Sequence, residues 1–178
     1  MPVQIGTKTH SFADPTALLS DCHRRIEMFL GILVKVAASI DRPLASDARL
    51  ALESALRYFR EAAPKHTADE ERSVFPRLRQ SRDAEVNGAL ETLDALEQEH
   101  RHADSLHAQI EILGKQGLAE GSLSPSPAGQ FREAVADLAS IYKRHIPIEE
   151  ELVFPMAERV LSPADKVIIA QEMSARRA

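Results

Sequence analysis

Apolar residues recur every three or four positions in four long segments of this chain, a spacing that places them on one face of an α-helix. No segment alternates apolar and polar residues in the way that predicts a half-buried β-strand. Because the segments are long and their connections short, the pattern predicts an all-α fold, an antiparallel up-down four-helix bundle. The apolar positions include Leu19, Ile26, Leu30 and Leu33; Leu52, Leu56, Phe59 and Ala63; Leu93, Leu96, Ala103 and Ile110; and Phe131, Val135, Leu138 and Met156.

Local sequence signals predict where these helices begin and end. Asp14-Pro15 is typical of a helix start, and the residues at 162–165 resemble a capping box that opens a short fifth helix. Gly114 and Gly117 predict the end of the third helix, and the Gly-, Ser- and Pro-rich stretch 117–127 predicts a linker between two halves of the chain. We therefore expect a flexible tail (1–13), a metal-binding bundle (14–160), and a C-terminal helix and tail (161–178).

Composition and charge narrow the class of protein. The 178 residues are enough for one domain with a hydrophobic core. A net charge of −5 argues against a nucleic-acid partner, because phosphate binding needs a basic face. No apolar run reaches the roughly 18 residues of a membrane span, and the N-terminus lacks the apolar stretch of a signal peptide. A single cysteine, Cys22, excludes an internal disulfide. We expect a cytoplasmic protein without a membrane partner.

A metal-ligand pattern occurs twice in the sequence. His66 and Glu70 are four residues apart, and so are His145 and Glu149, with an offset of 79 residues between the copies. In both copies a second Glu follows at once, and then Val-Phe-Pro at the same spacing. Residues i and i+4 of a helix lie about 5–6 Å apart on one face. One further histidine lies in the apolar stripe before each copy: His23 and His100.

Four histidines and two carboxylates on the inner faces would be costly to bury without a cation. Six ligands exceed the four of a tetrahedral zinc site, and the absence of a thiolate cluster argues against iron–sulfur chemistry. Two carboxylates on opposed helices can bridge two ions, and mixed imidazole and carboxylate ligands suit iron, then manganese. We expect two iron ions, bridged by an oxygen atom or by carboxylates, with manganese or zinc as substitutes.

The arrangement resembles the hemerythrin-like, or HHE cation-binding, family, whose motif is His and then His-x-x-x-Glu, stated twice. The resemblance covers roughly residues 14–160 and includes the Phe-Pro after each Glu pair. It implies a four-helix bundle with a non-haem di-iron centre bridged by Glu70 and Glu149. The motif residues are His23, His66, Glu70, His100, His145 and Glu149.

The chain departs from the oxygen-carrying members of that family. Those members hold a second histidine four residues after the third-helix histidine, where this chain has Asp104. They also end on a bridging Asp five residues after the fourth-helix histidine; Glu150 stands there, but Glu149 repeats the first motif better. Glu27 follows His23 at the four-residue spacing. Asp104 and Glu27 are candidates for extra ligands, for partners that orient the imidazoles, or for exposed acids.

Two further residues lie near the expected centre. Tyr142 precedes His145 by one turn on the inner stripe, where it can donate a hydrogen bond, bind iron or simply pack in the core. His107 follows His100 by two turns on the same face. We expect His107 to cap the cavity or line an entrance rather than bind metal.

The sequence leaves more than one function open. The first hypothesis is a non-haem di-iron protein that binds or reacts with oxygen, nitric oxide or hydrogen peroxide, with a role in stress defence or iron-centre repair. The alternative is a reversible oxygen or iron store without turnover. A third is an interaction bundle that the metal only stabilises. If the protein is an enzyme, we expect a di-iron oxidoreductase acting on peroxide or nitric oxide. The sequence names no protein partner.

Overall fold

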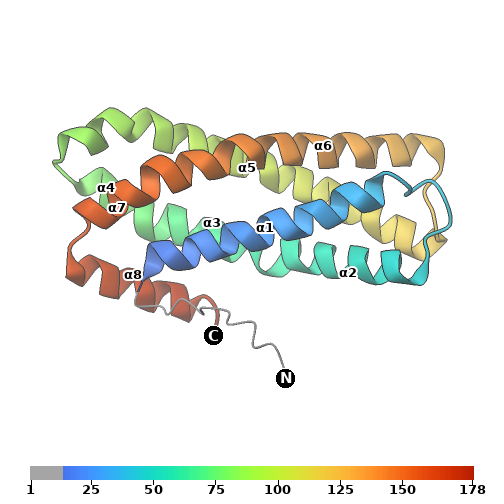
Figure 1. Cartoon of the computed structure of the whole chain (residues 1–178), viewed down its shortest axis with the longest axis horizontal. Coiled ribbons are helices and arrows are strands. Elements are labelled where there is room, and N and C mark those ends of the chain that lie inside the picture. The colour runs from blue at the N-terminus through green and yellow to red at the C-terminus, as the bar shows by residue number, and fades with distance from the viewer. Residues whose placement is uncertain (1–13) are drawn as a thin grey trace, which may run out of the picture.

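The structure is a computed structural model that describes residues 14–178, so the predicted tail at 1–13 lies outside the described residues. Helices are the only regular elements in the described part (Figure 1). They are α1 (Pro15–Ala37), α2 (Ser46–Glu61), α3 (Ala63–Asp69), η1 (Glu70–Val74), α4 (Phe75–Gln80), α5 (Ala84–Glu120), α6 (Pro125–Ile148), η2 (Glu149–Val153), α7 (Phe154–Val160) and α8 (Pro163–Ala175). The two η elements are π-helical.

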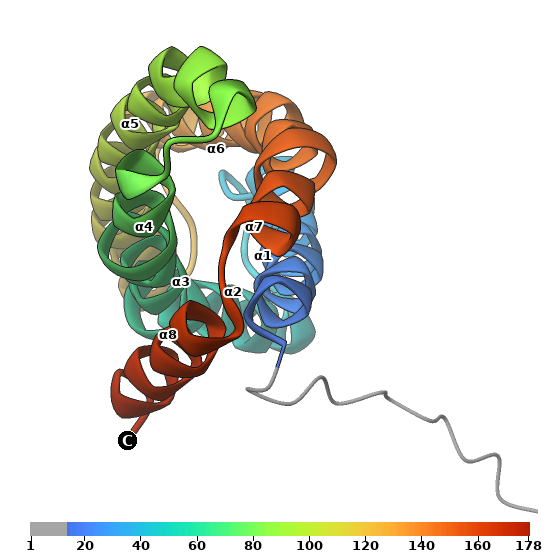
Figure 2. The same cartoon turned by 90° about the vertical axis from the view of Figure 1, so that its left-hand side faces the viewer.

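The predicted four-helix bundle with a short fifth helix is confirmed. One rod of the bundle is α1, the second runs from α2 to α4, the third is α5, and the fourth runs from α6 to α7. Each rod packs on two neighbours, so the order around the bundle is α1, α2, α5, α6. Figure 2 shows this ring of rods end-on, with α8 outside it against α1 and α3. None of the described helices combines the length and hydropathy that crossing a membrane requires.

The apolar core is divided in two along the bundle axis. In α1, Leu19 belongs to one hydrophobic cluster and Ile26 to the other. The same division falls between Ala63 and Val74 in the second rod. The positions between the two clusters are those of the motif histidines and glutamates, so the fold holds a buried polar layer between two apolar ones.

The prediction that Gly114 and Gly117 end the third helix is wrong, because both lie inside α5. A Cβ atom on Gly114 would lie 2.9 Å from a methyl carbon of Leu56. Glycine here lets two helices approach closely rather than breaking one. The helix ends instead at Gly121, whose φ of +85° is the left-handed conformation that glycine adopts readily. The connection to α6 is therefore shorter than the predicted linker.

Each copy of the Val-Phe-Pro motif lies where a π-helical turn ends. The N–H of Phe75 donates to the carbonyl of Glu70, and the N–H of Phe154 donates to that of Glu149, five residues back in each case. The proline that follows has no N–H and cannot extend the ordinary α-helical ladder through the turn. A π turn places one extra residue in the helix, and it does so directly after each motif glutamate.

Candidate metal centre

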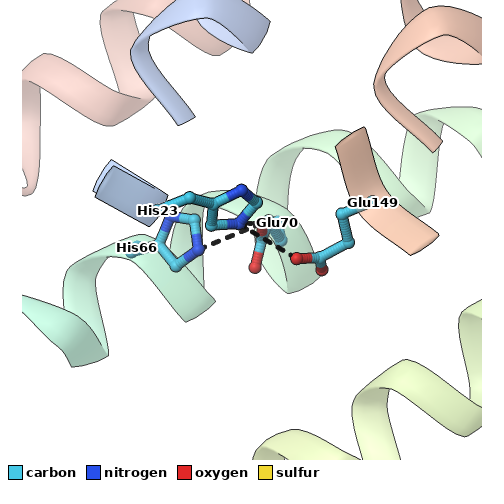
Figure 3. Close-up of side chains that lie close together, drawn as sticks. All are labelled: His23, His66, Glu70 and Glu149. Carbon is cyan, nitrogen blue, oxygen red and sulfur yellow. Dashed lines mark ion pairs between the residues drawn. The ribbon is translucent and has the colours of Figure 1, made fainter. Parts of the chain in front are cut away.

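The structure brings the six motif residues together in the buried layer. His23 comes from α1, His66 from α3 and Glu70 from η1, while His100 comes from α5, His145 from α6 and Glu149 from η2. All six are at most 6% exposed. Figure 3 shows four of them, His23, His66, Glu70 and Glu149, with the histidine rings and carboxylates pointing toward one another. All four rods therefore contribute potential ligands to the same buried layer.

The two carboxylates lie between the histidine rings. The Oε2 atom of Glu149 lies 3.1 Å from Nε2 of His23, and its Oε1 atom lies 3.0 Å from Nε2 of His145. The Oε1 atom of Glu70 lies 3.3 Å from Nε2 of His66, and its Oε2 atom lies 3.4 Å from Nε2 of His100. Each carboxylate therefore offers its two oxygens to histidines on different rods.

The same atoms divide into two compact groups of potential ligands. His23, His66, Glu70 and Glu149 form one group, and His100, His145 and Glu149 form the other. Within each group the ligand atoms lie within 4.8 Å of one another. Glu149 belongs to both groups, which is the arrangement expected of a bridging carboxylate.

Several of these buried atoms make no hydrogen bond within the described protein. They include both oxygens of Glu70, both oxygens of Glu149, and Nε2 of His23 and of His145. Buried polar atoms are nearly always paired, because losing water without a replacement costs free energy. All six atoms face the centre of the cluster, where bound cations would give them partners. The residues present therefore fit a metal site.

Three of the histidines are oriented from behind by a further carboxylate. Nδ1 of His23 lies 2.8 Å from Glu150. Nδ1 of His100 lies 2.9 Å from Glu71, and Nδ1 of His145 lies 2.9 Å from Glu99. A neutral imidazole that donates from Nδ1 keeps its lone pair on Nε2, the atom that faces the centre. His66 differs, because its buried Nδ1 has no hydrogen-bond partner among residues 14–178.

The two central carboxylates have opposite pKa shifts. Burial, followed by the charge of Glu149, raises the pKa of Glu70 well above its usual range. Burial also acts to raise the pKa of Glu149, but the close imidazoles of His145 and His23 lower it overall. Burial and the proximity of His23 lower the pKa of His66, which favours the neutral imidazole that a metal needs. Without a cation, this site disfavours two negative charges.

Comparison with known proteins agrees with this geometry. Residues 14–157 match the family described as the Hemerythrin HHE cation binding domain. The chain belongs to the hemerythrin family. An uncharacterized protein of Haemophilus influenzae is 30% identical over 166 residues, which cover 92% of this chain and 90% of that protein. Family membership and the His/Glu cluster together identify a metal-binding protein.

The other candidate ligands lie outside the two groups of this hemerythrin-like site. Glu27 is exposed on α1, and Asp104 is exposed on α5, where it lines a surface pocket. Glu150 lies behind His23 rather than at the centre. Tyr142 is buried in the apolar core, and its hydroxyl lies 3.3 Å from Nε2 of His107.

The sequence analysis did not predict that Glu71 and Glu99 orient histidines. It also did not predict the two π-helical turns. Glu71 was visible as the second Glu of the first motif, since its counterpart Glu150 does the same for the other half. Glu99 carried no such signal, because the residue in the equivalent place before His23 is Cys22. The repeated Phe-Pro is the sequence feature that coincides with the end of each π turn.

Proposed function

We propose that this hemerythrin-like protein binds two iron ions, and that the centre binds or reacts with a small molecule such as oxygen, nitric oxide or hydrogen peroxide. The observation that carries the proposal is that buried oxygens and nitrogens without a hydrogen-bond partner among the described residues lie within two groups of potential ligands, and that the two groups share Glu149. One ion alone would leave part of this set without a partner.

The roles of the residues follow from their positions. His23 and His66 would hold one ion and His100 and His145 the other, with Glu149 and Glu70 between them. Bound iron would supply the redox chemistry and the affinity for a diatomic or peroxide ligand. The carboxylates behind the histidines orient the imidazole rings toward the ions. The two apolar clusters exclude bulk water.

The small number of imidazoles favours a reactive centre. Two histidines and shared carboxylates on each side fill fewer positions than a six-coordinate ion accepts, and iron sites with few protein ligands keep positions open for small molecules. Asp104 does not add a ligand atom to either group. We therefore expect the iron-loaded protein to respond to added small ligands and to oxidise quickly in air.

The experiment is anaerobic purification, iron quantification, and visible spectra before and after addition of oxygen, nitric oxide or peroxide. We expect two irons per chain and a spectral change with each reagent. Glu70→Gln should lower the iron content, whereas Glu27→Gln, which changes an exposed acid at the same spacing from a histidine, should not. Full iron content in Glu70→Gln would contradict the bridging role. An oxygen adduct that persists for hours and releases oxygen under vacuum would favour the reversible store instead.

A further inference from the structure

A pocket of about 210 Å³ opens on the surface between α2 and α5, at the level of the α2–α3 junction. Phe59 and Pro64 form one side of it, and Asp104, His107 and Ala108 form another. The pocket thus lies one to two helical turns from His100. It is separate from the two ligand groups, and the proposed function gives it no role.

A chain of ring contacts connects this pocket with the centre. His107 stacks on Phe59 at the pocket wall, with ring centroids 4.8 Å apart. Its Nε2 lies 3.3 Å from the hydroxyl of Tyr142. The ring of Tyr142 meets the ring of His145 edge-on, with centroids 6.4 Å apart. A path of contacts through His107 and Tyr142 therefore joins the pocket wall to a motif histidine.

The outer nitrogens of three motif histidines are covered by charged side chains. Glu150, Glu71 and Glu99 are each about one-third exposed, and each is bonded to the outer nitrogen of a histidine. Displacing one of them would break a hydrogen bond that holds a ring in place. The His107–Tyr142 pair, by contrast, touches the centre only through a ring edge, so it can move without disturbing that support.

The charges of the pocket select among small molecules. Arg60, the basic residue of its lining, is already paired with Glu111 at 3.0 Å. Asp104 is the other acid at the wall. Burial lowers the pKa of His107 to about 4, so its ring is neutral at pH 7 and does not offset that acid. An anion entering here meets net negative charge, whereas an uncharged molecule does not.

We propose that this pocket is the entrance to the metal centre, with His107 and Tyr142 as its inner constriction, and that it admits small uncharged molecules in preference to anions. The inference rests on the proposed function, because it concerns access to the same centre. The charge of the pocket would determine which class of ligand reaches the centre, whereas the six central residues do not determine that class.

The test measures association and dissociation rates of nitric oxide and azide on the iron-loaded full chain by stopped-flow absorbance. Ala108→Trp should fill the pocket and lower both rate constants for nitric oxide by the same factor, about tenfold, with an unchanged equilibrium constant, because a blocked route affects entry and exit equally. Ala48→Trp is the matched control, since Ala48 lines a different surface pocket between α1 and α2, and it should change neither rate.

Two further variants test the constriction and the charge. Tyr142→Phe keeps the ring but removes the hydroxyl that is hydrogen-bonded to His107. The association and dissociation rates of nitric oxide should both rise. Asp104→Asn should speed azide association and leave nitric oxide association unchanged. Normal ligand binding with unaltered rates in Ala108→Trp would overturn the entrance alone. A chain that binds no iron, or whose spectrum ignores both ligands, would overturn the proposed function and the entrance with it.

Discussion

The segment from His66 to Phe75 and the segment from His145 to Phe154 share a motif and a π turn, but the surrounding protein supports them differently. In the first, the residue before the central glutamate is Asp69, fully buried and bonded to two arginines that follow α8. In the second, that residue is Ile148, which packs against an apolar cluster. We call the ion pairs of Asp69 with Arg176 and Arg177 the clamp. The clamp holds the first turn, and apolar packing holds the equivalent turn of the second segment.

The histidines of the two segments differ in the same way. His145 has Glu99 behind it. In the described part of the chain Nδ1 of His66 has no partner, and Cys22 stands in the place equivalent to Glu99. Further along the bundle, the second half carries the polar pair His107 and Tyr142, where the equivalent residues of the first half, Leu30 and Ala63, are apolar. A repeated ligand pattern therefore does not imply two equivalent metal positions.

The largest effect should come from removing the clamp on the first half. In Arg176→Met/Arg177→Met, Asp69 stays buried without a counter-charge, which costs about 3–5 kcal/mol when one side of a buried ion pair is lost. Urea unfolding of the metal-free protein measures the loss. Adding Asp69→Ile to the double variant copies the second half and should recover most of the stability. If the double variant unfolds like the wild type, the clamp does not support the first half.

The next effect concerns the carboxylate behind His145. Glu99→Gln keeps the size of the side chain but weakens its bond to the imidazole, and such changes typically lower metal affinity about 10–100-fold. Metal release to a chelator should occur in two phases in the wild type, because only one half lacks this support. Glu99→Gln should speed the slower phase until the two merge. A single release phase in the wild type would show that the halves hold metal equally.

A smaller effect, visible only in acid, comes from the polar pair of the second half. The pKa of His107 is lowered to about 4 in the folded protein by burial, so the folded state binds fewer protons than the unfolded state between that value and the usual 6.5. Stability from this group is present above pH 6.5 and is lost as the pH falls toward 4.

Replacing His107 should therefore flatten part of the acid side of the stability curve. In His107→Phe, we expect the decrease in unfolding free energy between pH 6.5 and 4.5 to shrink by on the order of 1–3 kcal/mol relative to the wild type. His102→Phe, at an exposed position on the same helix, is the control and should leave the curve unchanged. Parallel curves for wild type and His107→Phe would contradict the assignment.

The smallest effect is expected at Cys22. Burial raises the pKa of this thiol, so it is neutral at pH 7, and it makes no hydrogen bond to the free nitrogen of His66. Cys22→Ser should change metal release rates little. A loss of affinity similar to that in Glu99→Gln would mean that the cysteine does support His66, and the contrast between the halves would disappear.

The fold and the six central residues could be predicted from the sequence because both depend on local periodicity. The helical stripes placed the histidines inward, and the four-residue spacing paired each with a glutamate. The clamp could not be predicted in this way, since Arg176 and Asp69 are 107 residues apart and have no counterpart in the second half. Glu99 was missed for the same reason, and Gly114 was misassigned because close helix packing and helix termination both select glycine.

The π turns after Glu70 and Glu149 also bear on how the gene arose. A π turn corresponds to one residue inserted into an α-helix, and both copies have it at the same place in the motif. A single insertion in an ancestral helical hairpin, copied later by duplication of that hairpin, accounts for both turns with one event. The clamp and the Glu99 support, each present in one half only, would then be later additions to an originally symmetric pair.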